Sequence, residues 1–408
     1  MTESIKILPI PVGKYSDYRY NVIFKAYKWD PQVEDHSTVS KHAVLLEHET
    51  AKKLASWAEQ LSEETILMEE ELIHKVHLAK GLGIPHKIYK SLNKLSGYRR
   101  EKNVRLMRFD FHPTETGWAV SEVNSDVPGG FPESSVMPEI ASEYFEGYSP
   151  FNNVADRLLE SFKIKIKPGG TIALIHATAY SDDRQVMQFL GDYFDRGGFR
   201  TIFAAPDHIK WENKKAYSII KGREGEIDGI IRFFPLEWLA NLPNKSSRDG
   251  YYDCETVSCN HPVAIFAQSK RLPLIWDSLD TDIPTWEKLL PETINPKSIK
   301  SNDGSWIYKP ALGRVGEGIS IRGVLPEKEL RMIEKSAHSH PKDWIAQRMF
   351  NSRPLITPDG EEYHLCIGVF TVDGKCAGFY GRISPYRRID DKAKDIPILV
   401  SKEAPYAG

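Results

Sequence analysis

The clearest pattern in the chain is an alternation of apolar and polar residues over residues 107–126, interrupted by a Pro-Thr-Glu-Thr-Gly turn. A period of two on both sides of turn residues predicts a β-hairpin. Side chains two positions apart share a face of a strand, so Arg108 and Asp110 lie together on the first strand. Glu122 and Asn124 lie together on the second strand for the same reason. A register that pairs Asp110 with Glu122 pairs the other two as well, which would gather all four side chains on one sheet face.

Helical and irregular patterns flank this hairpin. Apolar residues recur at three- and four-residue steps over residues 48–78, which predicts a helix, and a second helix is expected after Pro85. The mixed residues 1–45 predict short strands and loops. After the hairpin, prolines and a Gly-Gly pair predict a shaped loop over residues 127–135. This loop is either a plain surface loop or one whose backbone N–H groups meet a substrate. A further helix is expected over residues 153–163.

The middle of the chain has the pattern of a β-α-β succession. Short apolar runs at 171–176, 200–205 and 227–234 predict strands, and the amphipathic run 182–196 predicts a helix that ends at a Gly-Gly pair. This order indicates an α/β layer. No Gly-x-Gly-x-x-Gly follows the first of these strands, and no Gly-x-x-x-x-Gly-Lys-[Ser/Thr] is present. Dinucleotide binding and a Walker-type phosphate loop are therefore both unsupported.

The last third of the chain adds a helical run, two strands and a second hairpin. Residues 262–276 have a helical pattern, and residues 305–310 and 344–350 predict short strands. The runs 361–371 and 375–384 flank a Val-Asp-Gly turn and predict a hairpin. The tail beyond this hairpin is charged and then apolar, and it predicts no single element.

A glycine-rich turn over residues 311–318 joins the strand that ends near Lys309 to an expected returning strand at 319–322. Three glycines would let its backbone amides close over phosphates: Gly313, Gly316 and Gly318. Lys309 and Arg314 lie beside the turn and favour that interpretation. An ordinary tight turn is the simpler alternative.

The composition sets limits on the function. The chain has 408 residues, enough for two or three domains, and its hydrophobic content of 41% is that of a soluble globular protein. Its 54 basic and 56 acidic residues give a formal net charge of −2, which provides no electrostatic case for nucleic acid or an anionic membrane as a partner. No run approaches the roughly 18 apolar residues of a membrane span. The first residues have no signal-peptide core.

The four cysteines indicate a reducing compartment, so a cytoplasmic location is expected. Cys254 and Cys259 have no second cysteine pair or convincing histidine partner, so we expect no zinc site. Cys366 and Cys376 fall in strand-like runs and are expected to be small core residues.

The polar side chains of the first hairpin would be costly to leave without a partner. Two adjacent carboxylates repel each other unless a cation lies between them. Oxygen ligands suit Mg²⁺ or Mn²⁺ rather than zinc, and Mg²⁺ usually takes one or two carboxylates plus substrate phosphates. Arg108 would then donate to a phosphate or a carboxylate. The alternative is an exposed hairpin with ordinary cross-strand polar pairs.

With these pieces placed, the chain resembles the glutathionylspermidine synthase family of ATP-grasp ligases over most of its length. The resemblance rests on short motifs: Arg108-Phe-Asp110, Glu122-Val-Asn124-Ser-Asp, Ser269-Lys270, Tyr308-Lys309-Pro310, Gly313-Arg-Val-Gly316, Gln347 and Gly378-Phe-Tyr-Gly-Arg382. The Glu-x-Asn pair precedes the nucleotide-binding lysines, as in that family, whose ATP-grasp fold is circularly permuted.

The resemblance implies an α/β (α+β) fold, a circularly permuted ATP-grasp fold with a Rossmann-like pre-ATP-grasp domain. Residues 1–165 would form the N-terminal part of the ligase domain, including the metal-binding hairpin. Residues 166–260 would form the Rossmann-like domain, and residues 261–408 the ATP-binding part of the ATP-grasp domain.

The resemblance also implies a metal site and two catalytic residues. Asp110, Glu122 and Asn124 would hold Mg²⁺ (or Mn²⁺) against the phosphates of ATP. Arg108 and Arg382 would neutralise the transferring phosphoryl group, because phosphoryl transfer relies on positioning and on stabilisation of charge.

A nucleotide site is implied in the same way. Lys270 and Lys309 would contact the phosphates of ATP, and the backbone around Gln347 would bind the adenine. The glycine-rich turn would cover the phosphates through four residues: Gly313, Arg314, Gly316 and Gly318.

The implied reaction forms an acyl phosphate on a small-molecule or peptide carboxylate, which an amine attacks to give an amide, ADP and phosphate. Two alternatives remain open: an ATP-binding protein of the same fold without catalysis, and a metal-dependent phosphohydrolase. The second leaves Lys270, Lys309 and the glycine-rich turn unexplained. No amidase domain is expected ahead of the ligase portion. The Ile-Ser-Pro-Tyr-Arg-Arg stretch after Arg382 departs from the family's usual ending, so glutathione and spermidine do not follow as substrates. Neither does an oligomeric state.

Overall fold

The computed structural model describes most of the chain, namely residues 5–29, 31–95, 97–177, 180–241, 248–300, 303–313, 319–321 and 324–402. None of the helices in these ranges is both long and apolar enough to cross a membrane.

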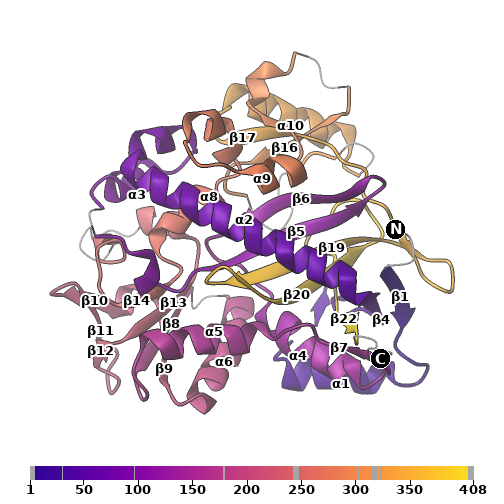
Figure 1. The fold of residues 1–408 in the computed structure, drawn as a ribbon, viewed down its shortest axis with the longest axis horizontal. Coiled ribbons are helices and arrows are strands. Elements are labelled where there is room, and N and C mark those ends of the chain that lie inside the picture. Colours follow the sequence, from indigo (N-terminus) through magenta and orange to yellow (C-terminus); the bar gives the residue numbers. More distant parts are fainter. Residues whose placement is uncertain are drawn as a thin grey trace, which may run out of the picture.

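An antiparallel sheet in the middle of the molecule carries both predicted hairpins side by side (Figure 1). Its strands run in the order β21-β20-β19-β5-β6, and β18 joins β19 at one end. Their bounds are β5 (Leu106–Thr114), β6 (Gly117–Asn124), β18 (Leu355–Ile356), β19 (Glu362–Val372), β20 (Lys375–Ser384) and β21 (Lys394–Ile396). The predicted register is confirmed, because Asp110 pairs with Glu122 and Arg108 pairs with Asn124. The turn of the second hairpin has positive φ at Asp373 and Gly374 (+47° and +83°), the conformation that suits a two-residue hairpin.

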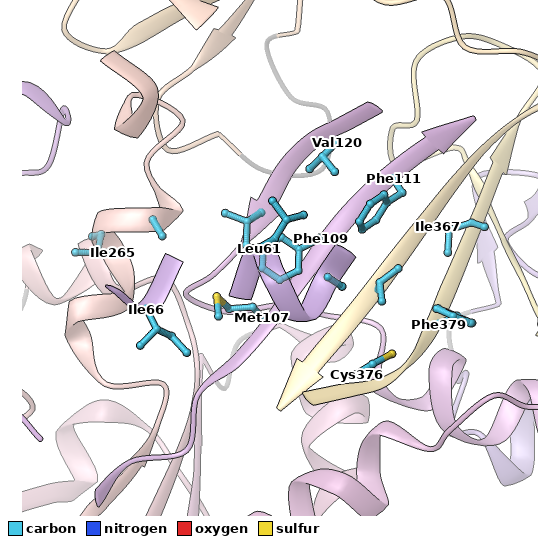
Figure 2. Packing of buried hydrophobic residues seen from close by; sticks show 14 of the residues in the cluster. Leu61, Ile66, Met107, Phe109, Phe111, Val120, Ile265, Ile367, Cys376 and Phe379 are labelled. Atoms are coloured by element: carbon cyan, nitrogen blue, oxygen red, sulfur yellow. The ribbon is translucent and has the colours of Figure 1, made fainter. Parts of the chain in front are cut away.

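The long helix α2 (His48–His74) crosses one face of this sheet, which confirms the helix predicted there (Figure 1). It is followed by a 3-10 helix at Val76–Gly81 and by α3 (His86–Leu92), the predicted helix after Pro85. Leu61 and Ile66 of α2 belong to the same buried cluster as Phe109 and Phe111 of β5 (Figure 2). Since odd-numbered residues of β5 fill this core, the even-numbered Asp110 faces the other side of the sheet.

A second sheet, of order β1-β4-β22-β7, joins the two ends of the described chain. Its bounds are β1 (Ile5–Pro9), β4 (His42–Leu46), β7 (Tyr148–Ser149) and β22 (Ile398–Ser401). Helices α1 (Tyr15–Lys25) and α4 (Phe131–Ser142) contact each other, and α4 also contacts β22. The tail beyond the second hairpin, for which no element was predicted, therefore supplies β21 and β22.

Two sequence-based expectations are corrected in this region. Residues 1–45 contain a helix, α1, as well as short strands, including β2 (Gln32–Val33) and β3 (His36–Ser37). The helix buries only Tyr18 and Val22, so its apolar stripe is too narrow to stand out in the sequence. The loop expected over 127–135 is shorter, because α4 begins at Phe131 and holds Pro132 in its first turn, where proline is well tolerated.

The predicted α/β layer is confirmed as a parallel sheet of order β14-β13-β8-β9. Its bounds are β8 (Thr171–His176), β9 (Arg200–Ala204), β13 (Gly229–Phe233) and β14 (Val257–Cys259). Helix α6 (Ser181–Arg196) contacts β8 and β9, and α5 (Val154–Lys165) contacts α6. The chain between β9 and β13 forms a separate antiparallel sheet that was not predicted. Its strands are β10 (Ile209–Glu212), β11 (Lys215–Ser218) and β12 (Gly225–Ile227).

The third part is a small sheet of order β15-β17-β16, with α10 (Glu327–Ser339) against β16. Its bounds are β15 (Thr293–Ile294), β16 (Trp306–Pro310) and β17 (Trp344–Arg348), which confirms the strands predicted at 305–310 and 344–350. The prediction of a returning strand at 319–322 is wrong for its described part, because residues 319–321 form no strand. Ser320 still donates its N–H to the Tyr308 carbonyl at 3.1 Å.

The helical run predicted over 262–276 is interrupted. A 3-10 turn at Pro262–Ala264 and α8 (Ile265–Gln268) precede an extended Ser269, and a second 3-10 helix covers Leu272–Ser278. The break has a tertiary cause. The Ser269 hydroxyl donates to the Leu82 carbonyl at 2.5 Å, and the Lys270 N–H donates to the Ala311 carbonyl at 2.9 Å. The next helix is α9 (Pro284–Leu289).

A buried polar network joins the hairpin to the parallel sheet. Asp126 accepts from the Arg232 guanidinium and from the Leu236 N–H, the second at 2.9 Å. The Gln268 side chain accepts from the N–H groups of Ser125 and Asp126 at 2.9 and 2.8 Å. The Ser-Asp pair that follows Asn124 therefore anchors the chain between sheets, and it orients the even-numbered face of the hairpin toward the region described next.

Candidate active site

The polar face of the central sheet lines a cavity of about 760 Å³. Seven of the site residues predicted from the sequence line it: Arg108, Asp110, Glu122, Asn124, Lys309, Gly313 and Arg382. Lys270 and Gln347 are not in the lining but contact residues that are, as described below. Arg314, Gly316 and Gly318 lie outside the described residues.

Arg108 and Asp110 form a paired unit on β5. Arg108 Nε and Nη2 donate to the two carboxylate oxygens of Asp110 at 2.8 and 3.0 Å. Asn124 Nδ2 donates to Asp110 Oδ2 at 3.0 Å, and Arg108 Nη1 donates to the Gly129 carbonyl at 2.7 Å. Burial opposes the charge of Arg108, but the Asp110 carboxylate raises the arginine pKa above its ordinary value. The four-residue constellation predicted from the hairpin thus exists, with its first carboxylate held by its arginine.

The position of Arg108 depends on two glycines and an aromatic ring. Its guanidinium carbon lies 5.0 Å from the centre of the Tyr380 ring, a cation–π arrangement. A Cβ atom on Gly368, the residue opposite Asp110 on β19, would come within 2.6 Å of Arg108 Cδ. Gly130 has a φ of +101°, and a Cβ there would lie 3.0 Å from the Tyr380 ring. The missing side chains therefore leave the space that the arginine and the tyrosine occupy.

Glu122 lies between two lysines from other parts of the chain. Lys270 Nζ is 3.0 Å from Glu122 Oε2 and donates to the Gly313 carbonyl at 2.6 Å. Burial by itself would raise the pKa of Glu122, but the ammonium groups of Lys270 and Lys309 lower it to about 2. Glu122 is therefore a carboxylate at neutral pH. Gly313 is the one glycine of the predicted loop among the described residues, and its carbonyl shares the Lys270 ammonium with Glu122.

Lys309, on β16, is buried and lines the cavity. Its Nζ donates to Gln347 Oε1 at 2.7 Å and to the Ser121 carbonyl at 3.2 Å. Burial lowers the pKa of Lys309 to about 8, against the opposing effect of Glu122. Gln347 lies on the central strand β17, with register partners on both sides, Ile307 and Thr293. Its side chain, which also donates to Thr293 Oγ1 at 3.1 Å, is the part that reaches Lys309.

Arg382 lies on β20, opposite Cys366 of β19 and Asp395 of β21. One of its terminal nitrogens donates to the Asp390 carbonyl, whereas its buried Nε has no hydrogen-bond partner among the described residues. Burial opposes its charge, but the neighbouring Tyr380 and Asp395 raise the pKa of Arg382. A charged group with an unused donor in the cavity wall is suited to receive an anion.

Sequence reasoning missed a second charged group in the cavity, centred on Lys28. Lys28 Nζ lies 2.8 Å from Glu133 Oε1 and 2.8 Å from Asp395 Oδ2. The Tyr380 hydroxyl donates to Asp395 Oδ1 at 2.7 Å. Burial opposes the charge of Lys28, but the two carboxylates raise its pKa well above the ordinary value. These residues come from separate parts of the chain, near residues 28, 133 and 380–395, and form no sequence motif, so no local signal could have found them.

His112 is a further residue that the sequence did not single out. It lies on the cavity side of β5, and its Nε2 is 3.0 Å from Ser121 Oγ. Burial lowers its pKa to about 4, so the imidazole is neutral at physiological pH. Cys366 and Cys376 are buried, as expected, and the structure holds no disulfide among its described cysteines.

The residues predicted to bind a metal are chemically suited to Mg²⁺. Asp110, Glu122 and Asn124 contribute two carboxylates and an amide oxygen from one face of the hairpin, a set of hard oxygen ligands. Arg108 and Lys270 neutralise these carboxylates in the structure as it stands. The donor set therefore fits a magnesium ion.

The chain is similar to known proteins over most of its length. Residues 15–401 match the family model described as glutathionylspermidine synthase preATP-grasp. A protein described as a candidate acid–amine ligase from Haemophilus influenzae is 23% identical over 232 residues, which is 55% of this chain and 57% of that protein. The chain thus spans little more than half the length of this relative.

A solved structure shows the same fold. A glutathione synthetase-like effector from Globodera pallida, in its apo form, has a TM-score of 0.65 and 10% sequence identity, with 96% of this chain and 98% of that chain covered. At this identity the likeness concerns the fold alone. It is a mixed α/β fold of the glutathione synthetase-like ATP-grasp type, as predicted from the sequence, with the hairpin carboxylates ahead of Lys270 and Lys309 in the chain.

Proposed function

The chain belongs to the glutathionylspermidine synthase preATP-grasp family, and from this premise we propose that it is an ATP- and Mg²⁺-dependent carbon–nitrogen ligase. It would join a small-molecule or peptide carboxylate to an amine through an acyl phosphate. The description of the Haemophilus relative as an acid–amine ligase supports this reaction class. The domain division expected from the sequence is part of the proposal: residues 166–260 are the Rossmann-like domain, and residues 1–165 and 261–408 together form the ligase domain.

The observation that carries the proposal is the gathering of charged groups at one cavity, which Arg108, Glu122, Lys309 and Arg382 line and which Lys270 reaches through its contact with Glu122. The Lys270 ammonium contacts Glu122, and the charges of Lys270 and Lys309 together lower the pKa of that carboxyl group. Arg108 and Arg382 both line the cavity and both interact with Tyr380. Cations at these positions match the requirement of phosphoryl transfer, in which charge spreads over the oxygens of the moving group.

Each group has a proposed task. The ammonium groups of Lys270 and Lys309 bind the phosphates of ATP, and Gly313 begins the loop that covers them. Asp110, Glu122 and Asn124 hold Mg²⁺, which when bound offsets the negative charge of the phosphates. The side chain of Gln347 keeps Lys309 in place, as its 2.7 Å contact with the ammonium indicates. The adenine would lie near Gln347.

The proposed reaction has two steps. A substrate carboxylate oxygen bonds to the γ-phosphorus as the bond from that phosphorus to ADP breaks, and Arg108 and Arg382 neutralise the transferring group. The amine nitrogen then bonds to the acyl carbon and loses a proton, and inorganic phosphate leaves. The first step needs the acid beside ATP, and the second needs the amine beside the acyl phosphate; a cavity of about 760 Å³ has room for these small groups.

The test is ADP formation by the purified protein with ATP and Mg²⁺, across a matrix of carboxylates and amines that includes glutathione with spermidine. ADP release that requires one acid and one amine together supports the ligase and identifies its substrates. ADP release with neither acid nor amine points instead to a phosphohydrolase. Tight ATP binding without turnover across a broad matrix favours a non-catalytic nucleotide-binding protein, and absence of nucleotide binding overturns the proposal.

A further inference from the structure

A second group of possible metal ligands lies away from the cavity, where β4 meets the turn before β19. A ring nitrogen of His42 and carboxylate oxygens of Asp359 and Glu361 all lie within 4.8 Å of one another. His42 is the first residue of β4, and the two acids lie in the turn between β18 and β19. The group therefore joins segments from the two ends of the chain.

The state of His42 is the observation that points to a ligand. Its side chain is 1% exposed, and its Nε2 has no hydrogen-bond partner among the described residues. An imidazole nitrogen that is buried without a partner loses its hydration and gains nothing in return. The ring also packs 5.8 Å from that of Tyr363, which restrains its orientation.

The two carboxylates are held in place by their own turn. Thr357 Oγ1 donates to Asp359 Oδ1 at 2.5 Å, and the Tyr363 hydroxyl donates to Glu361 Oε2 at 3.1 Å. The Thr357 N–H donates to the Glu361 carbonyl at 2.9 Å, which closes the turn. Hydrogen bonds of this kind orient the ligands of a metal site before the ion arrives.

The ammonium group of Lys41 lies beside these two acids. Lys41 Nζ lies 3.2 Å from Glu361 Oε2 and 3.9 Å from Asp359 Oδ2. The Lys41 side chain is 47% exposed, so it can move into solvent without cost in packing. Its ammonium pairs with the two carboxylates. A metal ion could instead bind all three side chains at once.

We propose that His42, Asp359 and Glu361 bind a divalent transition-metal ion, with Zn²⁺ as the best match to one imidazole and two carboxylates. Exposure of both acids leaves the fourth position to water. The ion would displace Lys41 and fasten β4 to the turn before β19. This site is independent of the proposed ligase activity and of the oxygen ligands suited to Mg²⁺ on the hairpin.

The metal would also brace one wall of the cavity. The segment just before His42 is hydrogen-bonded to Asp395, which donates its N–H to the Thr38 carbonyl at 2.7 Å and accepts from the Ser40 N–H at 2.8 Å. Thr38 and Asp395 both line the cavity. Zn²⁺ binding is therefore expected to raise the melting temperature of the protein.

The test is a calorimetric titration of the full chain with Zn²⁺ in the presence of saturating Mg²⁺. The wild type should bind one Zn²⁺ at this site, and Glu361→Gln should weaken that binding more than about tenfold, since even the loss of a supporting contact costs that much. Glu362→Gln is the matched control, because this neighbouring acid is exposed and is not one of the three clustered ligands. Asp359→Asn should behave like Glu361→Gln.

A variant of Lys41 makes the opposite prediction. Lys41→Met removes the competing ammonium, so Zn²⁺ should bind more tightly than in the wild type. If these residues form only an ion pair, Lys41→Met leaves Zn²⁺ binding unchanged. Equal affinity in the wild type and Glu361→Gln overturns the proposal, and so does a Zn²⁺ signal that disappears in Cys254→Ser or Glu122→Gln instead.

Discussion

The stem of Arg108 lies so close over Gly368 that a Cβ atom on the glycine would come within 2.6 Å of the arginine Cδ and 2.9 Å of its Nε. The two residues lie on adjacent strands, with Gly368 opposite Asp110. The glycine therefore determines where the guanidinium of Arg108 can be, and through it the position of Asp110.

Replacing this glycine tests the arrangement directly. Gly368→Ala should push Arg108 away from Asp110 and lower kcat, at a stability cost of about 1–3 kcal/mol for the added bulk. The measurements are steady-state ADP release and denaturant unfolding. Gly97→Ala serves as the control, because a Cβ there meets its nearest neighbour at an ordinary 3.7 Å. Equal loss of kcat in both variants contradicts a specific role for Gly368.

The hairpin carboxylates should be needed for turnover and dispensable for folding. Asp110→Asn and Glu122→Gln each keep the shape of the side chain but remove a charge proposed to hold Mg²⁺, so each should abolish ADP formation while circular dichroism stays unchanged. Glu115→Gln, at the turn of the same hairpin, is the control. Full activity in either carboxylate variant would contradict the proposal that these residues hold Mg²⁺.

Lys309 should make ATP binding depend on pH. Because burial lowers its pKa to about 8, its ammonium is lost as the pH rises through 8, and ATP affinity should fall over the same range. Lys309→Ala should bind ATP more weakly and lose this part of the pH dependence, as measured by calorimetry. Lys297→Ala, on the surface, is the matched control. An unchanged affinity in Lys309→Ala removes the residue from the site.

The same pKa has a consequence for stability with a definite sign. Between about pH 8 and the ordinary lysine value of 10.5, the unfolded chain binds a proton at Lys309 that the folded chain does not. The contribution of Lys309 to the free energy of unfolding should therefore increase as the pH rises through that window. In Lys309→Ala the contribution should be absent, which denaturant unfolding at several pH values can check.

Lys28 should matter for stability as well as for the cavity. Lys28→Met leaves Glu133 and Asp395 side by side and buried without their shared cation, which should cost about 3–5 kcal/mol of unfolding free energy. Lys25→Met, on the exposed side of α1, is the control and should cost little. The loss should appear at neutral pH, because the two carboxylates hold the pKa of Lys28 well above its ordinary value. A difference below about 1 kcal/mol would mean that these contacts act like surface ion pairs.

Local periodicity predicted much of the fold correctly. The pairing of Asp110 with Glu122 agrees with the period of two on each strand, but a β-bulge between Asp110 and Phe111 sets it, because the register that leaves the turn would bring Asp110 opposite Ser121. The helix α2 and the parallel strand β8 followed from apolar spacing. Where the apolar signal was narrow, as in α1 with two buried residues, the prediction failed.

By itself, the sequence determined the hairpin, its four polar side chains, and the oxygen chemistry that suits Mg²⁺. Only the tertiary structure decided which cations meet that chemistry: Lys270 reaches Glu122 because α8 breaks at Ser269, where the hydroxyl bonds to Leu82. It also placed Lys28 between Glu133 and Asp395. The physical reason is that spacing along a chain specifies contacts within one element, whereas contacts between distant segments depend on how the elements pack.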